Sequence, residues 1–152
     1  WVISDVKSSG TNGGTFTQSA WRTRDLNTLV KPSGTGTDVQ LDIAPAATNQ
    51  LRIEDGTYWV YAVVPADGVD EHKARFQNIT DGITELNGTS IDTRTNRTCP
   101  STLMGYLVVS SGPKVYEVQH RCFDTRNNTG FGVAAGFGTV EVYTTINFVK
   151  LL

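Results

Sequence analysis

A glycine-rich stretch near the C-terminal end has the spacing closest to a known chemical motif. GFGVAAGFG places Gly130, Gly132 and Gly136 in the pattern G-x-G-x-x-x-G, which invites a phosphate-binding interpretation. A dinucleotide site also needs a helix after the loop, because the pyrophosphate binds at a helix N-terminus. The residues that follow read TVEVYTTINFV, and their β-branched and aromatic side chains at period two predict a strand. The stretch is therefore predicted to be a connection between two strands.

Acidic residues and a histidine gather in a second stretch, DGVDEH. It contains Asp67, Asp70, Glu71 and His72, and oxygen ligands of this kind could bind Ca²⁺. The stretch lacks the EF-hand loop pattern, and acidic turns are common, so a solvated turn is expected. The other histidine, His120, lies far along the chain, and neither H-E-x-x-H nor C-x-x-C is present. We expect no metal and no cofactor.

The sequence offers no recognisable catalytic centre. There is no G-x-S-x-G nucleophile elbow, and no pair of carboxylates of the kind that glycosidases place in a groove can be identified. We therefore expect no enzyme activity and name no catalytic residue. Cys99 and Cys122 are the two cysteines, and composition favours two free thiols, although it leaves their pairing open.

Composition points to one all-β domain. The 152 residues suit a single domain with its own core. Glycine is abundant, and short apolar runs are separated by turn residues, a pattern typical of strands. The net charge of −2 gives no field that would draw the chain to nucleic acid. No run approaches the ~18 apolar residues of a membrane span, so we expect no membrane insertion.

One predicted strand is apolar on both faces. In YWVYAVV the odd and even positions point to opposite sides, and both sets are apolar. An antiparallel sheet usually leaves one face in water. Tyr58, Val60, Ala62 and Val64 share one face and Trp59, Tyr61 and Val63 the other. The pattern predicts a core on one of these sides and a partner subunit on the other. A loop folded over the outer face is the alternative.

Further strands are predicted at residues 1–7, 39–43, 50–54, 102–110, 114–123 and 139–149, with a tight turn at Asp55-Gly56. In the 114–123 segment, Tyr116, Val118, His120 and Cys122 share one face. Residues 90–101 are polar and irregular, which predicts a long surface loop. Eight to ten short strands of this kind predict a sandwich, jelly roll or barrel.

Aromatic and polar side chains in predicted loops are the candidates for ligand recognition. In the glycine-rich region, the upstream half DTRNNTG is expected to be exposed, whereas Phe131 and Phe137 are expected to anchor the downstream half. The candidate receptor-binding residues are Trp21, Arg22, Arg24, Arg94, Asn96, Arg97, Arg126, Asn127 and Asn128.

The run GTYWVYAVVPADGVDEHKARFQNITDGITELNGTS, together with YEVQHRC and GFGVAAGFGTVEVYT, resembles the C1q/TNF-like jelly-roll domains found at the C-termini of phage tail-fibre and other virion-attached proteins. The resemblance extends from about residue 23 to the end, with Val60 where C1q domains more usually have an aromatic residue. It implies a ten-stranded, two-sheet antiparallel jelly roll that forms a homotrimer and binds a receptor. The candidate trimer-interface residues are Trp59, Tyr61, Val63, Tyr116, His120 and Tyr143.

These observations predict a single jelly-roll domain over residues 1–152, with residues 1–20 as a candidate linking segment. Because the chain starts at Trp1 and ends on a predicted strand, we expect the C-terminal tip of a longer fibre protein. The expected role is non-enzymatic host attachment on the virion, beside other tail proteins. The expected receptor is bacterial polysaccharide, lipopolysaccharide or an outer-membrane protein. A structural trimerisation or folding cap and a secreted C1q-like lectin are the alternatives.

Overall fold

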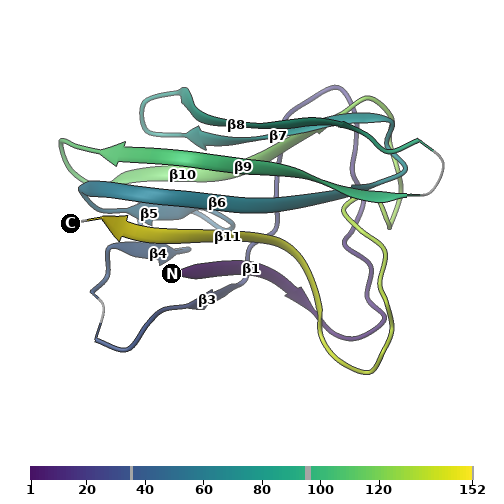
Figure 1. Ribbon diagram of the computed structural model, residues 1–152, viewed down its shortest axis with the longest axis horizontal. Coiled ribbons are helices and arrows are strands. Elements are labelled where there is room, and N and C mark those ends of the chain that lie inside the picture. The colour runs from purple at the N-terminus through teal and green to yellow at the C-terminus, as the bar shows by residue number, and fades with distance from the viewer. Residues whose placement is uncertain (35, 95–96, 152) are drawn as a thin grey trace.

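The computed structural model describes residues 1–34, 36–94 and 97–151, and these residues form eleven β-strands and no helix. The strands run along the long axis of the molecule, and the long connections gather at its ends (Figure 1). No helix in these ranges has the length and hydropathy of a membrane span. The strands are β1 (Val2–Lys7), β2 (Arg22–Thr23), β3 (Thr28–Val30), β4 (Val39–Leu41), β5 (Leu51–Ile53), β6 (Gly56–Asp67), β7 (Glu71–Asn78), β8 (Ile83–Asp92), β9 (Thr98–Val109), β10 (Lys114–Cys122) and β11 (Glu141–Leu151).

Two antiparallel sheets make up the sandwich. The first has the strand order β3-β1-β11-β6-β9, and the second has β4-β5-β10-β7-β8, with β2 added beside β10. Consecutive strands stay in one sheet only from β4 to β5 and from β7 to β8, and every other connection between the described strands crosses to the opposite sheet. The prediction of an all-β, two-sheet antiparallel fold is therefore confirmed, with eleven strands instead of about ten.

The core lies between the sheets and explains the two-faced strand. Tyr58, Val60, Ala62 and Val64 of β6 are fully buried against the second sheet. On β10, Tyr116 is buried as well and stacks on Phe76 with ring centroids 5.0 Å apart. The predicted alternation of both strands is confirmed, because each places one apolar set in the same core.

The region expected to be a long surface loop, residues 90–101, is mostly strand. Residues 90–92 continue β8, and residues 98–101 begin β9. The loop prediction for these strand residues is wrong because β8 is an edge strand whose outer face meets solvent, so polar side chains are compatible with a strand there. At the other end of the chain, residues 2–7 form β1 between β3 and β11. This part of the candidate linking segment is integral to the first sheet.

Two long connections, residues 8–21 and 123–140, run beside each other at one end of the sandwich (Figure 1). Backbone hydrogen bonds join them, from Gly13 N–H to the Gly132 carbonyl at 2.9 Å and between Phe16 and Arg126 in both directions. An added Cβ at Gly13 would lie 2.6 Å from the backbone carbonyl carbon of Phe131, and one at Gly130 would lie 2.6 Å from the Cβ of Phe16. The two connections therefore form one layer whose close approach depends on missing side chains.

Candidate functional site

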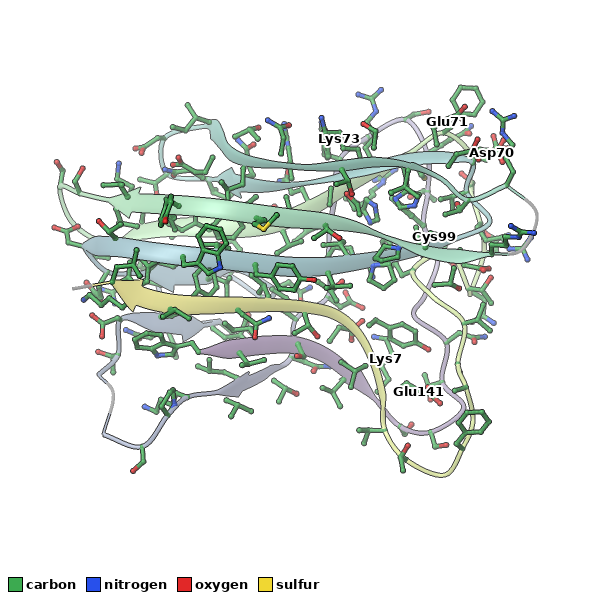
Figure 2. All side chains as sticks on the ribbon, in the orientation of Figure 1. Lys7, Asp70, Glu71, Lys73, Cys99 and Glu141 are labelled. Atoms are coloured by element: carbon green, nitrogen blue, oxygen red, sulfur yellow. The ribbon has the colours of Figure 1, made fainter. Side chains whose placement is uncertain are left out.

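The glycine-rich stretch does surround an anion, but the anion belongs to the protein. One carboxylate oxygen of Glu141, at the start of β11 (Figure 2), accepts hydrogen bonds from the Gly136 and Gly10 N–H groups at 2.8 and 3.0 Å. The other oxygen accepts from Ala135 N–H at 3.1 Å. These three bonds lower the pKa of the Glu141 carboxyl. An external phosphate would have to displace this side chain.

The two phenylalanines expected to anchor this stretch behave differently. Phe131 is buried against Phe16, with ring centroids 4.7 Å apart. Phe137 is 87% exposed, so the expectation that it is an anchor is wrong. The chain turns outward after Gly132 to place its amides around the Glu141 carboxylate, and Phe137 lies at the exposed part of that turn.

Arg24, a candidate receptor-binding residue, is fully buried instead. Its guanidinium donates hydrogen bonds to Thr144 Oγ1 at 2.7 Å and to the carbonyls of Pro65 and Phe131 at 3.1 and 3.2 Å. It also lies 3.9 Å from the centroid of the Phe131 ring. Burial lowers the pKa of Arg24 to about 9, opposed by Asp5, so it remains charged at neutral pH. This residue ties the 123–140 connection to β6 and β11 and is not a surface contact.

The two histidines meet in the interior. His72 Nδ1 and His120 Nε2 are 2.8 Å apart, and the His120 ring packs on Phe16 at 4.7 Å between centroids. The second nitrogen of each ring has no hydrogen-bond partner in the described part of the chain. Burial, followed by the charge of Arg24, lowers the pKa of His72 to about 4, and burial likewise lowers that of His120.

The acidic turn around Asp67 makes internal contacts. Asp67 is 2% exposed and accepts a hydrogen bond from Thr98 Oγ1 at 3.1 Å. Asp70 takes a left-handed backbone conformation with φ of 57° at the β6–β7 turn. Within residues 1–34, 36–94 and 97–151, no group of three or more His, Cys, Asp or Glu side chains could hold a metal ion.

The six candidate trimer-interface residues divide into two sets. Trp59, Tyr61 and Val63 lie on the outer face of the first sheet, where Tyr61 is 39% exposed. The other three lie inside the protomer, beneath the packed sheets and connections. The buried three are Tyr116, His120 and Tyr143, at 0%, 0% and 7% exposed.

The outer face of the first sheet is apolar across three neighbouring strands. Register places Trp59 opposite Tyr106 of β9 and Val149 of β11, and Tyr61 opposite Met104. The Trp59 and Tyr106 rings pack edge to face at 5.1 Å. The exposed apolar residues of this face are Tyr61, Met104, Tyr106, Val108, Val149 and Leu151. An apolar surface of this extent is typical of an interface.

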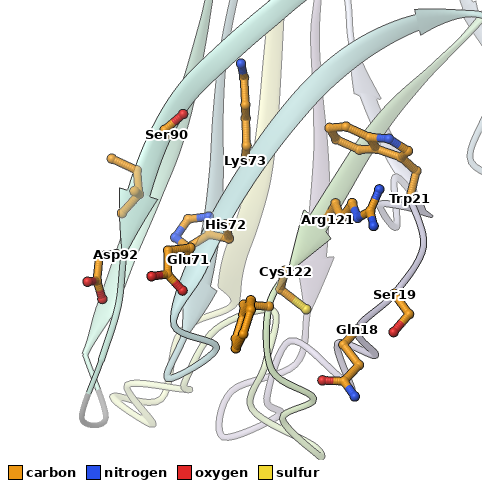
Figure 3. Close-up of a pocket in the computed structure, with 12 residues that line it drawn as sticks. Gln18, Ser19, Trp21, Glu71, His72, Lys73, Ser90, Asp92, Arg121 and Cys122 are labelled. Atoms are coloured by element: carbon orange, nitrogen blue, oxygen red, sulfur yellow. The ribbon is translucent and has the colours of Figure 1, made fainter.

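The second sheet carries an open pocket of about 850 Å³ on its outer face. The segment with Gln18, Ser19 and Trp21 forms one side, and β8 with Ser90 and Asp92 forms the other (Figure 3). Its floor is made by the ends of β7 and β10. The residues that line it are Gln18, Ser19, Trp21, Glu71, His72, Lys73, Ser90, Ile91, Asp92, Arg121, Cys122 and Phe123.

Of the candidate receptor-binding residues, Trp21 lines this pocket, and Arg94 lies at its rim, 3.0 Å from Glu71 and 3.1 Å from Asp92. Arg22 is exposed on β2, and Arg97 is exposed before β9. Asn96 lies outside the described residues. Arg126, Asn127 and Asn128 form the turn beside the pocket, where Arg126 donates to Thr129 at 3.2 Å and Asn127 and Asn128 are exposed.

Sequence reasoning did not select Lys73, Arg121 or Phe123, which also line the pocket. The alternation of the 114–123 segment puts Arg121 on the face opposite Tyr116 and Val118. The sequence pattern does not show that β10 pairs with β7 or in which register, because strands far apart in sequence can be aligned in many registers. The position of Lys73 opposite Arg121 therefore could not be predicted.

Both cysteines are free thiols. Cys122 is 5% exposed, and its thiol donates to the Asp124 carbonyl at 3.2 Å. Burial raises its pKa to about 11, so it remains a thiol at neutral pH. Cys99 lies on β9, half-buried.

Comparison with solved structures defines the fold class. Two crystal structures of murine APRIL, at pH 8.5 and pH 5.0, superpose with TM-scores of 0.53 and 0.52. They are 13% and 12% identical in sequence, over 99% and 98% of this chain and 98% and 99% of theirs. The chain thus has a TNF-like jelly-roll fold. No protein-family model and no curated protein matches it.

Proposed function

We propose that this chain is a non-enzymatic, homotrimeric receptor-binding domain at the tip of a phage tail fibre. The observation that carries the proposal is the apolar outer face of the first sheet. Tyr106 and Val108 are each 66% exposed there, and Met104 is 61% exposed. Monomeric proteins seldom leave so many large apolar side chains together in water. Packing this face against two further copies of the chain removes these apolar side chains from solvent.

The trimer leaves the recognition surface free. The pocket beside Trp21 lies on the outer face of the second sheet, on the opposite side of the sandwich from the apolar face. Three copies of one pocket on a rigid body can bind a repeating surface together. Avidity then compensates for a shallow site of modest affinity.

The phage setting rests on the sequence resemblance described above. The solved structures add support for a TNF-like jelly roll. In this proposal the domain lies outside the particle, beside other tail proteins. It binds a polysaccharide, lipopolysaccharide or outer-membrane protein of the bacterial host.

Adsorption to cells tests the receptor role. The purified domain should adsorb to host cells and compete with the parent virion. The variant Trp21→Ala should reduce adsorption while the oligomer stays intact, and Val133→Ala, at an exposed position in the 123–140 connection, is the matched control. A folded trimer that neither adsorbs nor competes on any susceptible strain would overturn the receptor role.

A structural cap is the second candidate function, since the same apolar face would serve a domain that only trimerises its fibre. The pocket variants separate the two. If Trp21→Ala abolishes infection while the trimer persists, the domain recognises a receptor. If pocket variants leave infection unchanged but apolar-face variants prevent fibre assembly, the domain is a cap.

A further inference from the structure

Two cations at paired positions of β7 and β10 line the pocket without a neutralising partner. Lys73 of β7 is directly opposite Arg121 of β10 in the antiparallel register, and both lie on the solvent side of the sheet (Figure 3). In the described part of the chain, neither side chain forms a hydrogen bond or an ion pair. Like charges directly opposite each other on neighbouring strands destabilise a sheet, so this pair costs folding free energy.

Neighbouring charges in the same pocket are neutralised. Glu71 and Asp92 are also directly opposite each other on β7 and β8, but Arg94 binds both carboxylates. Arg75, two residues along β7 from Lys73, donates twice to Gln119 Oε1 at 2.7 and 2.9 Å. Its guanidinium also lies 4.2 Å from the Trp21 ring centroid. Lys73 and Arg121 thus lack the partners that the charged side chains beside them have.

The size and lining of the pocket suit a ligand larger than a single ion. Its volume of about 850 Å³ is within the range of small-molecule sites. Apolar surface comes from Trp21, Ile91 and Phe123, the last of which is 67% exposed. Ser90 and Gln18 add groups that can donate and accept hydrogen bonds. Cations, aromatic rings and short polar groups together suit a charged, hydroxylated ligand.

We propose that Lys73 and Arg121 bind the anionic group of a surface glycan, either a uronic-acid carboxylate or a sugar phosphate. The sugar ring would lie against Trp21 or Phe123, and its hydroxyls would meet Ser90 and the carboxylates at the rim. This inference deepens the proposed function and rests on it for the source of the ligand.

A glycan fits this pocket better than an acidic peptide. Extended peptides are often bound by adding a strand to a free sheet edge, but the floor of this pocket offers none, because β7 is paired with β8 and β10, and β10 is paired with β7 and with β2 and β5. The carboxylates of Glu71 and Asp92 are already paired with Arg94, and their oxygens can still accept hydrogen bonds from sugar hydroxyls. The charge pattern therefore favours a ligand that carries a single anionic group and many hydroxyl groups.

Binding of small probes to the whole domain tests the subsite. Galacturonic acid and mannose 6-phosphate each present one of the two anions, and maltotriose and a hexaglutamate peptide are the neutral and peptide comparisons. We expect one of the anionic sugars to bind at millimolar concentration and to shift the Trp21 indole N–H resonance. Lys73→Gln and Arg121→Gln should each weaken its binding by about tenfold, as expected for lost hydrogen bonds to a charged group. Lys31→Gln, which removes the same charge after β3, should leave binding unchanged.

The two proposals can fail separately. If neither anionic sugar binds, if maltotriose binds equally well, or if hexaglutamate binds best, the glycan subsite is wrong even where the trimer adsorbs to host cells. If an anionic sugar binds through Lys73 and Arg121 but the trimer adsorbs to no cell, the subsite stands and the receptor role fails.

Discussion

His72 Nδ1 and His120 Nε2 lie 2.8 Å apart inside the sandwich, where His72 is 3% exposed and His120 is fully buried. A hydrogen bond between two ring nitrogens requires at least one of them to be unprotonated. The fixed charge of Arg24 lies close enough to oppose protonation of both rings. The His120 ring packs on Phe16 of the 8–21 connection. Protonation of the histidine pair should therefore weaken the packing of the two long connections.

The first prediction is a loss of stability in mild acid. The folded pKa of His72 is lowered from 6.5 to about 4, so the unfolded chain binds more protons between these values. Stability is fully present above about pH 6.5 and falls as the pH drops toward 4, by at most about 1.4 kcal/mol per pH unit for each histidine. Urea unfolding at several pH values measures this slope.

The variant His72→Gln removes one titrating ring and is the control for that slope. Its unfolding free energy should depend less on pH in the same window. An unfolding free energy of the natural sequence that is constant from about pH 7 to about pH 5 would contradict the linkage argument.

The second prediction concerns the carboxylate that the glycine-rich stretch surrounds. Glu141→Gln removes the charge that three backbone N–H groups bind, so the 123–140 connection should be cleaved faster in limited proteolysis. Because the folded pKa of Glu141 is lowered, the natural sequence should show the same sensitivity as pH falls below about 4.5. Asp124→Asn, at an exposed position, is the control. Equal cleavage rates for both variants would show that the amides do not depend on the charge.

The third prediction separates the effect of a steric clash from that of backbone strain at two glycines of the glycine-rich stretch. Gly132→Ala places a Cβ 2.5 Å from the Tyr143 ring at a φ of 136°, and it should destabilise the domain by about 2 kcal/mol or more. Gly136→Ala has a φ of 69° but nothing within 4 Å, so it should cost about 1 kcal/mol. Thermal unfolding measures both. A larger loss of stability for Gly136→Ala than for Gly132→Ala would contradict this prediction. It would mean that the Tyr143 ring moves aside at a lower free-energy cost than the backbone strain at residue 136.

Strand periodicity predicted much of the fold. The alternation of β6 and β10 required only local information, because side chains of period two must point to opposite faces. The burial of Arg24 could not be predicted in this way. Its partners Thr144, Pro65 and Phe131 come from three distant parts of the chain, and a polar residue beside a short strand otherwise indicates a surface.

The pocket shows the same limit. Trp21 was selected from its residue type, but Lys73 and Arg121 become a pair only through the register of β7 with β10. The edge strand β8 was partly mistaken for a loop, because its polar outer face lacks the apolar period that identifies a buried strand.

The mass of the domain in solution tests the central claim most directly, since both proposed roles depend on the apolar face. Sedimentation equilibrium should give three times the chain mass of 16.5 kDa. Tyr106→Glu, at the centre of the exposed face, should give single chains, while Ile83→Glu, at an exposed apolar position on β8, should remain trimeric. A folded natural domain that sediments as a single chain at every concentration would contradict the homotrimer and with it the proposed assembly.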